Sequence, residues 1–218
     1  MKIKWLGHSA FLITSKSGTR VVIDPYEPGG YGGGLAYGDF GESADVVLIS
    51  HEHADHGYTP FVKGSPIVIR GAGEFKAAGI VFEGIATFHD TSGGAERGKN
   101  TVYSFTVDGV RVCHLGDLGH VLTSEQAVVI GAVDVLLAPV GGHFTIGPEE
   151  AAKVTDQLAA RVVIPMHYKT EKVDFPIGPV EDFLKGKADV RRLDVSEIEI
   201  TPESLPKETQ IIVLKHAL

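Results

Sequence analysis

The sequence predicts an α/β layered domain in which helices cover β-sheets. Short apolar runs separated by turn residues fill the first half of the chain and are typical of strands. From about residue 123, apolar runs alternate with segments that carry helix start signals. Because no solenoid-like repeat and no linker-like stretch divides the chain, we expect residues 1–218 to form a single domain.

The first half of the chain predicts a series of strands that opens with a three-stranded meander. Asp24 ends the meander and precedes Pro25, which favours an extended backbone at Asp24. Asp108-Gly109 is a strong hairpin signal between the last two strands of this half. We expect a single strand or a pair at 79–88, and single strands at 2–6, 10–14, 20–24, 45–50, 66–70, 101–107 and 110–115.

The second half predicts alternating helices and strands. Thr123-Ser124-Glu125-Gln126 resembles a capping box and starts one helix. Pro148 and the two glutamates after it open a second helix, which reaches about Ala160. A third helix is expected at 178–187, and strands are expected at 134–139, 161–166, near 190, at 197–201 and at 210–214.

Composition and charge favour a cytoplasmic protein that acts on a small-molecule substrate. A formal net charge of -8 opposes an electrostatic grip on nucleic acid or on an anionic membrane. The single cysteine, Cys113, cannot form an internal disulfide and is expected in the core, which fits a reducing compartment. The best candidate membrane span, 128–140, is interrupted by Asp134, and no signal-peptide pattern opens the chain. A homo-oligomer is compatible with these observations.

The residues His51-Glu52-His53-Ala54-Asp55-His56 form the motif with the clearest chemistry. Three histidines and an aspartate follow directly on an apolar, β-branched strand, so they lie in a loop held by a sheet. Imidazole and carboxylate suit zinc, and also iron, manganese and nickel. A polar loop that merely contains histidines is the competing interpretation, and this density of ligands argues against it. We expect Glu52, between two candidate ligands, to point away from the metal.

Three further candidates share one setting at the ends of apolar strands. They are His89, Asp117 and His167. Strands that end at one rim of a sheet can bring such side chains together. His114 competes with His89 as a ligand, and we favour His89 because it ends its strand while His114 lies within one.

This combination of H-x-H-x-D-H, a later histidine, Gly-Asp and a strand-terminal histidine resembles the metallo-β-lactamase superfamily. The resemblance spans Trp5 to about Tyr168, with Asp24 matching the first motif. The stretches 7–12 and 165–168 resemble the compact branch of metal-dependent hydrolases that includes L-ascorbate-6-phosphate lactonase. The resemblance implies a four-layer αββα sandwich that binds two divalent metal ions per chain, zinc in the first place, with manganese, iron or nickel also compatible.

The resemblance also implies how the ligands divide between the two metals. One ion is expected at His51, His53 and His89, the other at Asp55, His56 and His167, with Asp117 bridging them. Asp55 and Asp117 are the expected catalytic residues. Asp24 is expected to orient a ligand histidine. The candidate substrate contacts are His8, Arg97, His143, Tyr168 and Lys169, although a solvated loop or surface position is the competing interpretation for Arg97, His8 and His143.

Several segments keep two interpretations at this stage. The glycine-rich stretch 28–41 lacks a phosphate-loop pattern and is either a lid near the site or a surface loop. His114 is either a partner of a ligand or a core residue, and the sequence assigns no role to His120.

The function expected from these residues is metal-dependent hydrolysis. Two metals lower the pKa of a bound water from about 15.7 toward about 7, and the hydroxide attacks a small ester, lactone or phosphodiester. The alternatives are an iron-dependent redox protein on the same fold and a metal-binding module without catalysis. A structural zinc closes with four ligands, which argues against the binding module. An RNA nuclease is disfavoured by the acidic charge, and a glutathione-thioester hydrolase by the lack of an added helical region.

Overall fold

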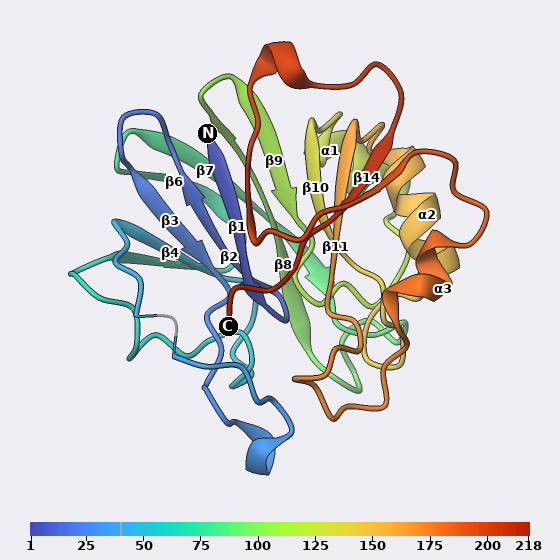
Figure 1. Cartoon of the computed structure of the whole chain (residues 1–218), viewed down its shortest axis with the longest axis horizontal. Helices are drawn as coiled ribbons and strands as arrows, with labels where there is room; N and C mark the ends of the chain where they lie inside the picture. The colour runs from blue at the N-terminus through green and yellow to red at the C-terminus, as the bar shows by residue number, and fades with distance from the viewer. Residues whose placement is uncertain (40) are drawn as a thin grey trace.

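Two β-sheets packed face to face form the centre of the computed structural model, which describes residues 1–39 and 41–218 (Figure 1). One sheet has the order β13-β1-β2-β3-β4-β5, and the other has the order β12-β14-β11-β10-β9-β8-β7-β6. One large hydrophobic core fills the space between the sheets and continues under the helices of the second sheet. This arrangement confirms the predicted α/β sandwich.

The six-stranded sheet combines an antiparallel meander with a parallel part. Strands β1, β2 and β3 pair antiparallel, whereas β3, β4 and β5 run parallel. Side chains alternate along β4: Val46 and Leu48 enter the core between the sheets, while Val47 and Ile49 enter a second core outside. The strands are β1 (Lys2–Gly7), β2 (Ala10–Thr14), β3 (Arg20–Ile23), β4 (Val46–Ile49), β5 (Ile67–Arg70) and β13 (Glu197–Glu199).

The eight-stranded sheet is antiparallel from β6 to β9 and parallel from β9 to β12. Its strand β6 was not predicted: the sequence signal at 79–88 covers only the second strand of a hairpin that turns at Ala78-Gly79. The strands are β6 (Gly73–Ala77), β7 (Ile80–Phe88), β8 (Lys99–Val107), β9 (Val110–His114), β10 (Val135–Pro139), β11 (Val162–Met166), β12 (Val190–Arg192) and β14 (Gln210–Val213).

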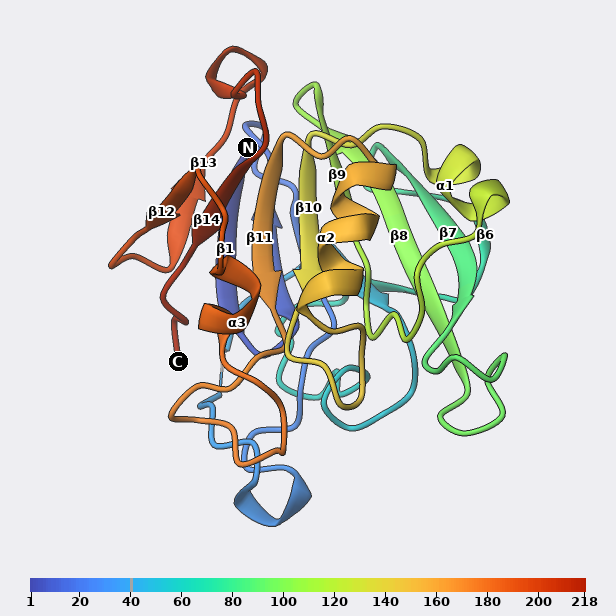
Figure 2. The same ribbon diagram turned by 90° about the vertical axis from the view of Figure 1, so that its right-hand side faces the viewer.

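The described α-helices lie on one side of the sandwich. Figure 2 shows α1 (Ser124–Ile130), α2 (Pro148–Gln157) and α3 (Val180–Leu184) in front of the eight-stranded sheet. The capping box at Thr123 is confirmed, since its side chain accepts from the backbone of Gln126. Two short 3-10 turns, η1 (Tyr31–Gly33) and η2 (Pro202–Ser204), complete the elements. No helix in the described part of the chain is long and apolar enough to cross a membrane.

Loops instead of helices cover the outer face of the six-stranded sheet. The second core combines strand residues such as Leu12 and Val47 with Tyr26, Leu35 and Tyr37 from the segment after β3. The layer that the resemblance implies on this side is therefore built from loops in the described residues, because aromatic side chains of the loops supply the apolar cover. The same loops carry the backbone toward the rim where the predicted ligands lie.

Backbone hydrogen bonds join the two sheets at one rim. The amide of Thr101 donates to the carbonyl of Ser50 at 2.9 Å, and the amide of His167 donates to the carbonyl of His8 at 3.2 Å. The hydroxyl of Tyr103 donates to the carbonyl of Ile49 at 3.0 Å. These bonds fix the ends of strands from both sheets relative to each other, as a preorganised site requires.

Candidate metal centre

A tight turn after β4 directs the motif residues toward one point. The amides of His56 and Gly57 both donate to the carbonyl of His53, at 3.0 and 2.8 Å. The turn replaces the alternation of a strand, which would send neighbouring side chains to opposite faces. Glu52 points away, as expected, and accepts a hydrogen bond from Arg70 at 2.8 Å on the exposed side.

Three buried residues of the site have a left-handed backbone at the end of a strand. They are His8 (φ 51°), Asp24 (φ 47°) and His167 (φ 49°), after β1, β3 and β11. This conformation costs a non-glycine residue roughly 1 kcal/mol or more. At Asp24 it contradicts the extended backbone predicted from Pro25, because three hydrogen bonds to the Asp24 carboxylate hold the residue in place. In each case the kink turns a polar side chain into the site.

The first group of candidate ligands, named here the outer group, consists of His51, His53 and His89. One ligand atom from each lies within 4.8 Å of the others. Nε2 of His51 is 3.1 Å from Nδ1 of His53, and the His51 and His89 rings are 4.9 Å apart. His51 and His89 are buried, whereas His53 is exposed.

The second group, named here the inner group, consists of Asp55, His56 and His167, with His8 beside it. The four residues offer ligand atoms within 4.8 Å of one another and all are buried. Nε2 of His8 lies 3.2 Å from Oδ2 of Asp55. Since an ionised carboxylate only accepts, His8 carries its proton on Nε2 and orients Asp55. The remaining three residues are those that the resemblance assigns to one metal.

Asp117 lies between the two groups. Its Oδ1 is 3.1 Å from Nε2 of His56, and its Oδ2 is 3.2 Å from Nε2 of His89 and 3.4 Å from Nε2 of His167. The side-chain oxygen of Asn100 accepts a hydrogen bond from the backbone amide of Asp117 at 2.9 Å and so holds that backbone in place. One carboxylate therefore faces histidines of both groups, as a bridging ligand must.

Asp24 orients histidines of both groups through one buried carboxylate. Its Oδ2 accepts from Nδ1 of His56 at 2.9 Å and from the hydroxyl of Ser50 at 2.6 Å. Because that hydroxyl donates its hydrogen to Asp24, it accepts a hydrogen bond from Nδ1 of His51 at 3.0 Å. In the neutral form of each histidine the proton is then on Nδ1, and the unprotonated Nε2 faces the site, which is the tautomer that binds a metal.

Burial and the neighbouring charges set the protonation of these groups. Burial, followed by the charge on His56, lowers the pKa of His51 to about 3. Burial would raise the pKa of Asp24, but its hydrogen bond and charge interaction with His56 outweigh that effect and lower it. Burial lowers the pKa of His56, yet the charges of Asp117 and Asp55 prevail and raise it well above its ordinary value. His51 is therefore in the neutral form that binds metal, whereas His56 would have to give up the proton on Nε2 to bind an ion.

The donor set fits divalent metal ions. Nε2 of His56 and Oδ1 of Asp117 are buried and 3.1 Å apart, yet neither has a hydrogen-bond partner in the described part of the chain. Buried polar atoms normally have a partner, so two such atoms aimed at a shared point are what an ion would satisfy. Nitrogen and oxygen donors of this kind suit zinc, manganese and iron.

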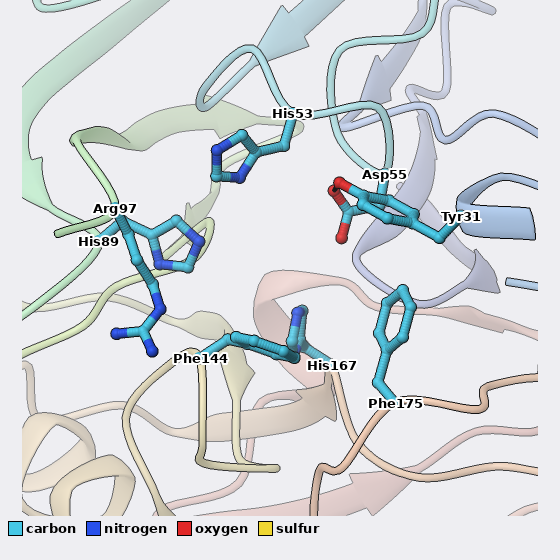
Figure 3. Close-up of a pocket in the computed structure, with 8 residues that line it drawn as sticks. All are labelled: Tyr31, His53, Asp55, His89, Arg97, Phe144, His167 and Phe175. Carbon is cyan, nitrogen blue, oxygen red and sulfur yellow. Dashed lines mark hydrogen bonds between the residues drawn. The ribbon is translucent and has the colours of Figure 1, made fainter. Parts of the chain in front are cut away.

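A cavity of about 400 Å³ opens beside these residues (Figure 3). Candidate ligands from both groups line it, together with three aromatic side chains and one arginine. The lining residues are Tyr31, His53, Asp55, His89, Arg97, Phe144, His167 and Phe175. The hydroxyl of Tyr31 donates to Oδ1 of Asp55 at 2.9 Å. A cavity of this size suits a small ligand.

Three of the expected substrate contacts lie elsewhere. Tyr168 is buried against Trp5, with ring centroids 5.3 Å apart. Lys169 donates to the carbonyl of Phe175 at 3.1 Å and so supports the loop that carries this cavity residue. His143 is exposed and packs its ring on Phe144. None of the three lines the cavity, but each adjoins or contacts a residue that does: His167, Phe175 and Phe144, respectively.

The remaining histidines have structural partners. His114 accepts from the amide of Gly116 at 3.0 Å and donates to the carbonyl of Ser9 at 2.9 Å, so both ring nitrogens are used and His89 is the residue in the site. His120 accepts from the amide of Phe88 and contacts the carbonyl of Val121. Neither residue lines the cavity.

Sequence reasoning missed Tyr31, Phe144, Phe175 and Asn100. Tyr31 had a signal, since it is an aromatic residue with two glycines on each side. That stretch is anchored: the amide of Ala36 donates to the carbonyl of Lys172 and the amide of Asp174 donates to the carbonyl of Gly34. Of the stretch 28–41, which was interpreted as either a lid or a surface loop, residue 40 lies outside the described residues. The anchoring brings Tyr31 and Phe175 together at the cavity, with ring centroids 5.3 Å apart.

A two-sheet α/β sandwich with clustered histidines and carboxylates at one rim defines a metallo-β-lactamase fold. The profile of the beta-lactamase superfamily domain matches residues 2–167. A UPF0173 metal-dependent hydrolase of Pyrococcus horikoshii is 31% identical over 195 residues, covering 78% of this chain and 85% of that protein. One from Korarchaeum cryptofilum is 31% identical over 206 residues, covering 86% of this chain and 87% of that protein.

A solved structure extends the likeness to almost the whole chain. It is a Thermotoga maritima protein, described as a candidate Zn-dependent hydrolase of the metallo-beta-lactamase superfamily, with 42% identity and a TM-score of 0.81. The match covers 98% of this chain and 97% of that one. The chain therefore belongs to the beta-lactamase superfamily and, within it, to the UPF0173 family of metal-dependent hydrolases.

Proposed function

We propose that this protein hydrolyses a small anionic ester, lactone or phosphodiester with two divalent metal ions, zinc in the first place. The observation that carries the proposal is the position of Asp117 between the outer group and the inner group. His51, His53 and His89 would hold one ion and Asp55, His56 and His167 the other. Seven side chains exceed the four that close a structural zinc site.

Metal ions in such sites supply Lewis acidity, lowering the pKa of water from about 15.7 to about 7 and polarising substrate oxygens. The chain itself supplies positioning. Tyr31 and His8 donate to different oxygens of Asp55, which fixes the carboxylate at the cavity wall. In this position Asp55 can orient an attacking water and accept its proton. Asp24 and Asn100 hold His56 and Asp117 in the same rigid frame.

The cavity supports a small substrate with an apolar part. Tyr31, Phe144 and Phe175 form one wall, and Arg97 stands opposite the carboxylate of Asp55 (Figure 3). Aromatic walls exclude water from a reacting group and so strengthen electrostatic interactions there. A lactone or ester with an anionic substituent satisfies both the apolar wall and the arginine.

The test compares turnover of two substrates by zinc- and manganese-loaded protein. One substrate is a chromogenic phosphodiester and the other a sugar-phosphate lactone followed by acid release. Asp55→Ala should reduce turnover of the accepted substrate by at least about 100-fold, the range of a lost acid–base group. Circular dichroism should show that the fold persists. Undiminished turnover by Asp55→Ala after metal loading would contradict the proposal.

A further inference from the structure

The loop 90–98, between β7 and β8, is built around one carboxylate. Oδ1 of Asp90 accepts from the amides of Ser92 and Gly94, both at 2.8 Å. Oδ2 accepts from the amides of Glu96 and Arg97 at 3.0 and 2.8 Å. Four hydrogen bonds to a single buried side chain hold the loop in one conformation without regular secondary structure. The loop follows directly on His89, so it is fixed relative to the outer group.

This loop places the side chain of Arg97 at the cavity. Its guanidinium carbon lies 5.7 Å from the centre of the Phe144 ring, within reach of a cation–π contact. Figure 3 shows the guanidinium extending beside His89 toward Phe144. Its ion pair with Glu96 is long, at 3.6 Å, and the Glu96 side chain is 59% exposed. Apart from this long ion pair, the guanidinium makes no hydrogen bond to any residue that the structure describes, so its N–H donors are available to a ligand.

Arg97 also stands where two cavities meet. The cavity beside the candidate metal ligands and a larger groove of about 770 Å³ share two lining residues, His53 and Arg97. The groove runs past Arg70 and Lys99. Arg70 is paired with Glu52, whereas Lys99 has no ion pair within the described residues. A negative group bound at Arg97 would therefore lie between the reacting centre and a groove with additional positive charge.

We propose that Arg97 binds an oxyanion of the substrate outside the bond that is cleaved, and that Asp90 is the positioning residue that holds it there. The substrate class is an ester whose apolar part contacts Phe144 and whose phosphate or carboxylate reaches Arg97. A planar guanidinium binds such oxyanions through two parallel hydrogen bonds, which a lysine cannot reproduce. The reaction class rests on the proposed function, but the anion site itself does not.

Binding of simple probes tests the site without turnover. Calorimetry would compare phenylphosphonate, benzoate and the neutral benzyl alcohol with zinc-loaded wild type and variants. Arg97→Gln should weaken binding of one or both anions by about 10-fold or more, the size of a lost charged hydrogen bond. Benzyl alcohol should change less than about twofold, and Arg97→Lys should recover only part of the loss. The more affected probe distinguishes a phosphate from a carboxylate ligand.

A matched control and a double mutant separate positioning from general effects. Arg191→Gln removes the same charge from an exposed position on β12 and should leave anion binding unchanged. Asp90→Asn should weaken anion binding in the wild-type background and add nothing in the Arg97→Gln background, because both changes remove one interaction. Additive losses from Asp90→Asn and Arg97→Gln, or equal losses for anions and alcohol, would overturn the proposal.

Turnover of a matched substrate pair distinguishes this inference from the proposed function. The pair is 4-nitrophenyl glutarate, which has a free carboxylate, and neutral 4-nitrophenyl butyrate. Arg97→Gln should lower the ratio of their kcat/KM values by about 10-fold. If the wild type hydrolyses neither the test substrates nor this pair while its anion binding depends on Arg97, the proposed function fails and the anion site stands. If the wild type hydrolyses both and the ratio is unchanged in Arg97→Gln, the anion site fails and the hydrolase stands.

Discussion

The outer and inner groups of candidate ligands differ in burial and in support. The inner group is buried and held by hydrogen bonds: His56 to Asp24, and Asp55 to both His8 and Tyr31. In the outer group His53 is exposed, and its one hydrogen-bonding neighbour in the described chain is His51. A ligand whose orientation is fixed in advance loses less entropy on binding. We therefore expect the inner group to bind its metal more tightly and to contribute more to stability.

The largest expected effect is a difference in stability between two variants that each lack one imidazole, one from the inner group and one from the outer group. His56→Ala removes the imidazole that contacts the buried carboxylates of both Asp24 and Asp117, so the free energy of unfolding should fall by about 3 kcal/mol. His53→Ala truncates an exposed side chain and should change it by less than about 0.5 kcal/mol. Urea unfolding of the metal-free proteins would measure both. Equal losses would mean that the two groups are equally supported.

An intermediate effect on zinc affinity is expected from changing the carboxylate of Asp24, which supports histidines of both groups. Asp24→Asn disturbs the orientation of His56 and, through Ser50, of His51, so zinc affinity should fall by about 10- to 100-fold. Ser50→Ala removes the hydroxyl that links His51 to Asp24 but leaves the contact between Asp24 and His56, so it should weaken zinc binding by less. Competition with a chromogenic chelator would resolve the two ions. A larger loss from Ser50→Ala than from Asp24→Asn would reverse this order of support.

The smallest effect is expected at Glu52, which lies between two candidate ligands of the motif. Glu52→Gln removes an exposed ion pair with Arg70, so stability should change by less than about 0.5 kcal/mol. Zinc affinity should stay within about twofold, since the side chain points away from the site. Differential scanning fluorimetry and the same chelator competition would measure these quantities. A loss of zinc affinity comparable to that of His53→Ala would show that Glu52 belongs to the outer group.

The sequence by itself predicted most strands and the candidate ligands that the fold brings together. Four of the candidate ligands are neighbours along the chain, so the sequence alone indicates that they act together. They are His51, His53, Asp55 and His56. His89, Asp117 and His167 could be selected because each ends an apolar strand, and parallel strands end at a common rim. Periodicity and turn signals are local properties, and of the strands that the structure describes only β6 was missed, because most of its side chains are exposed.

Only the tertiary structure decided which side chains complete the site. Tyr31, Asn100 and Phe175 reach it through pairings between segments far apart in sequence, as when 34–36 pairs with 172–174. The left-handed backbone at Asp24 overrode the local preference set by Pro25, because its carboxylate gains three hydrogen bonds there. Phe144 faces the cavity while His143 does not, and Asp90 holds the loop that carries Arg97. Both features depend on where each loop packs, and local sequence patterns do not record those contacts.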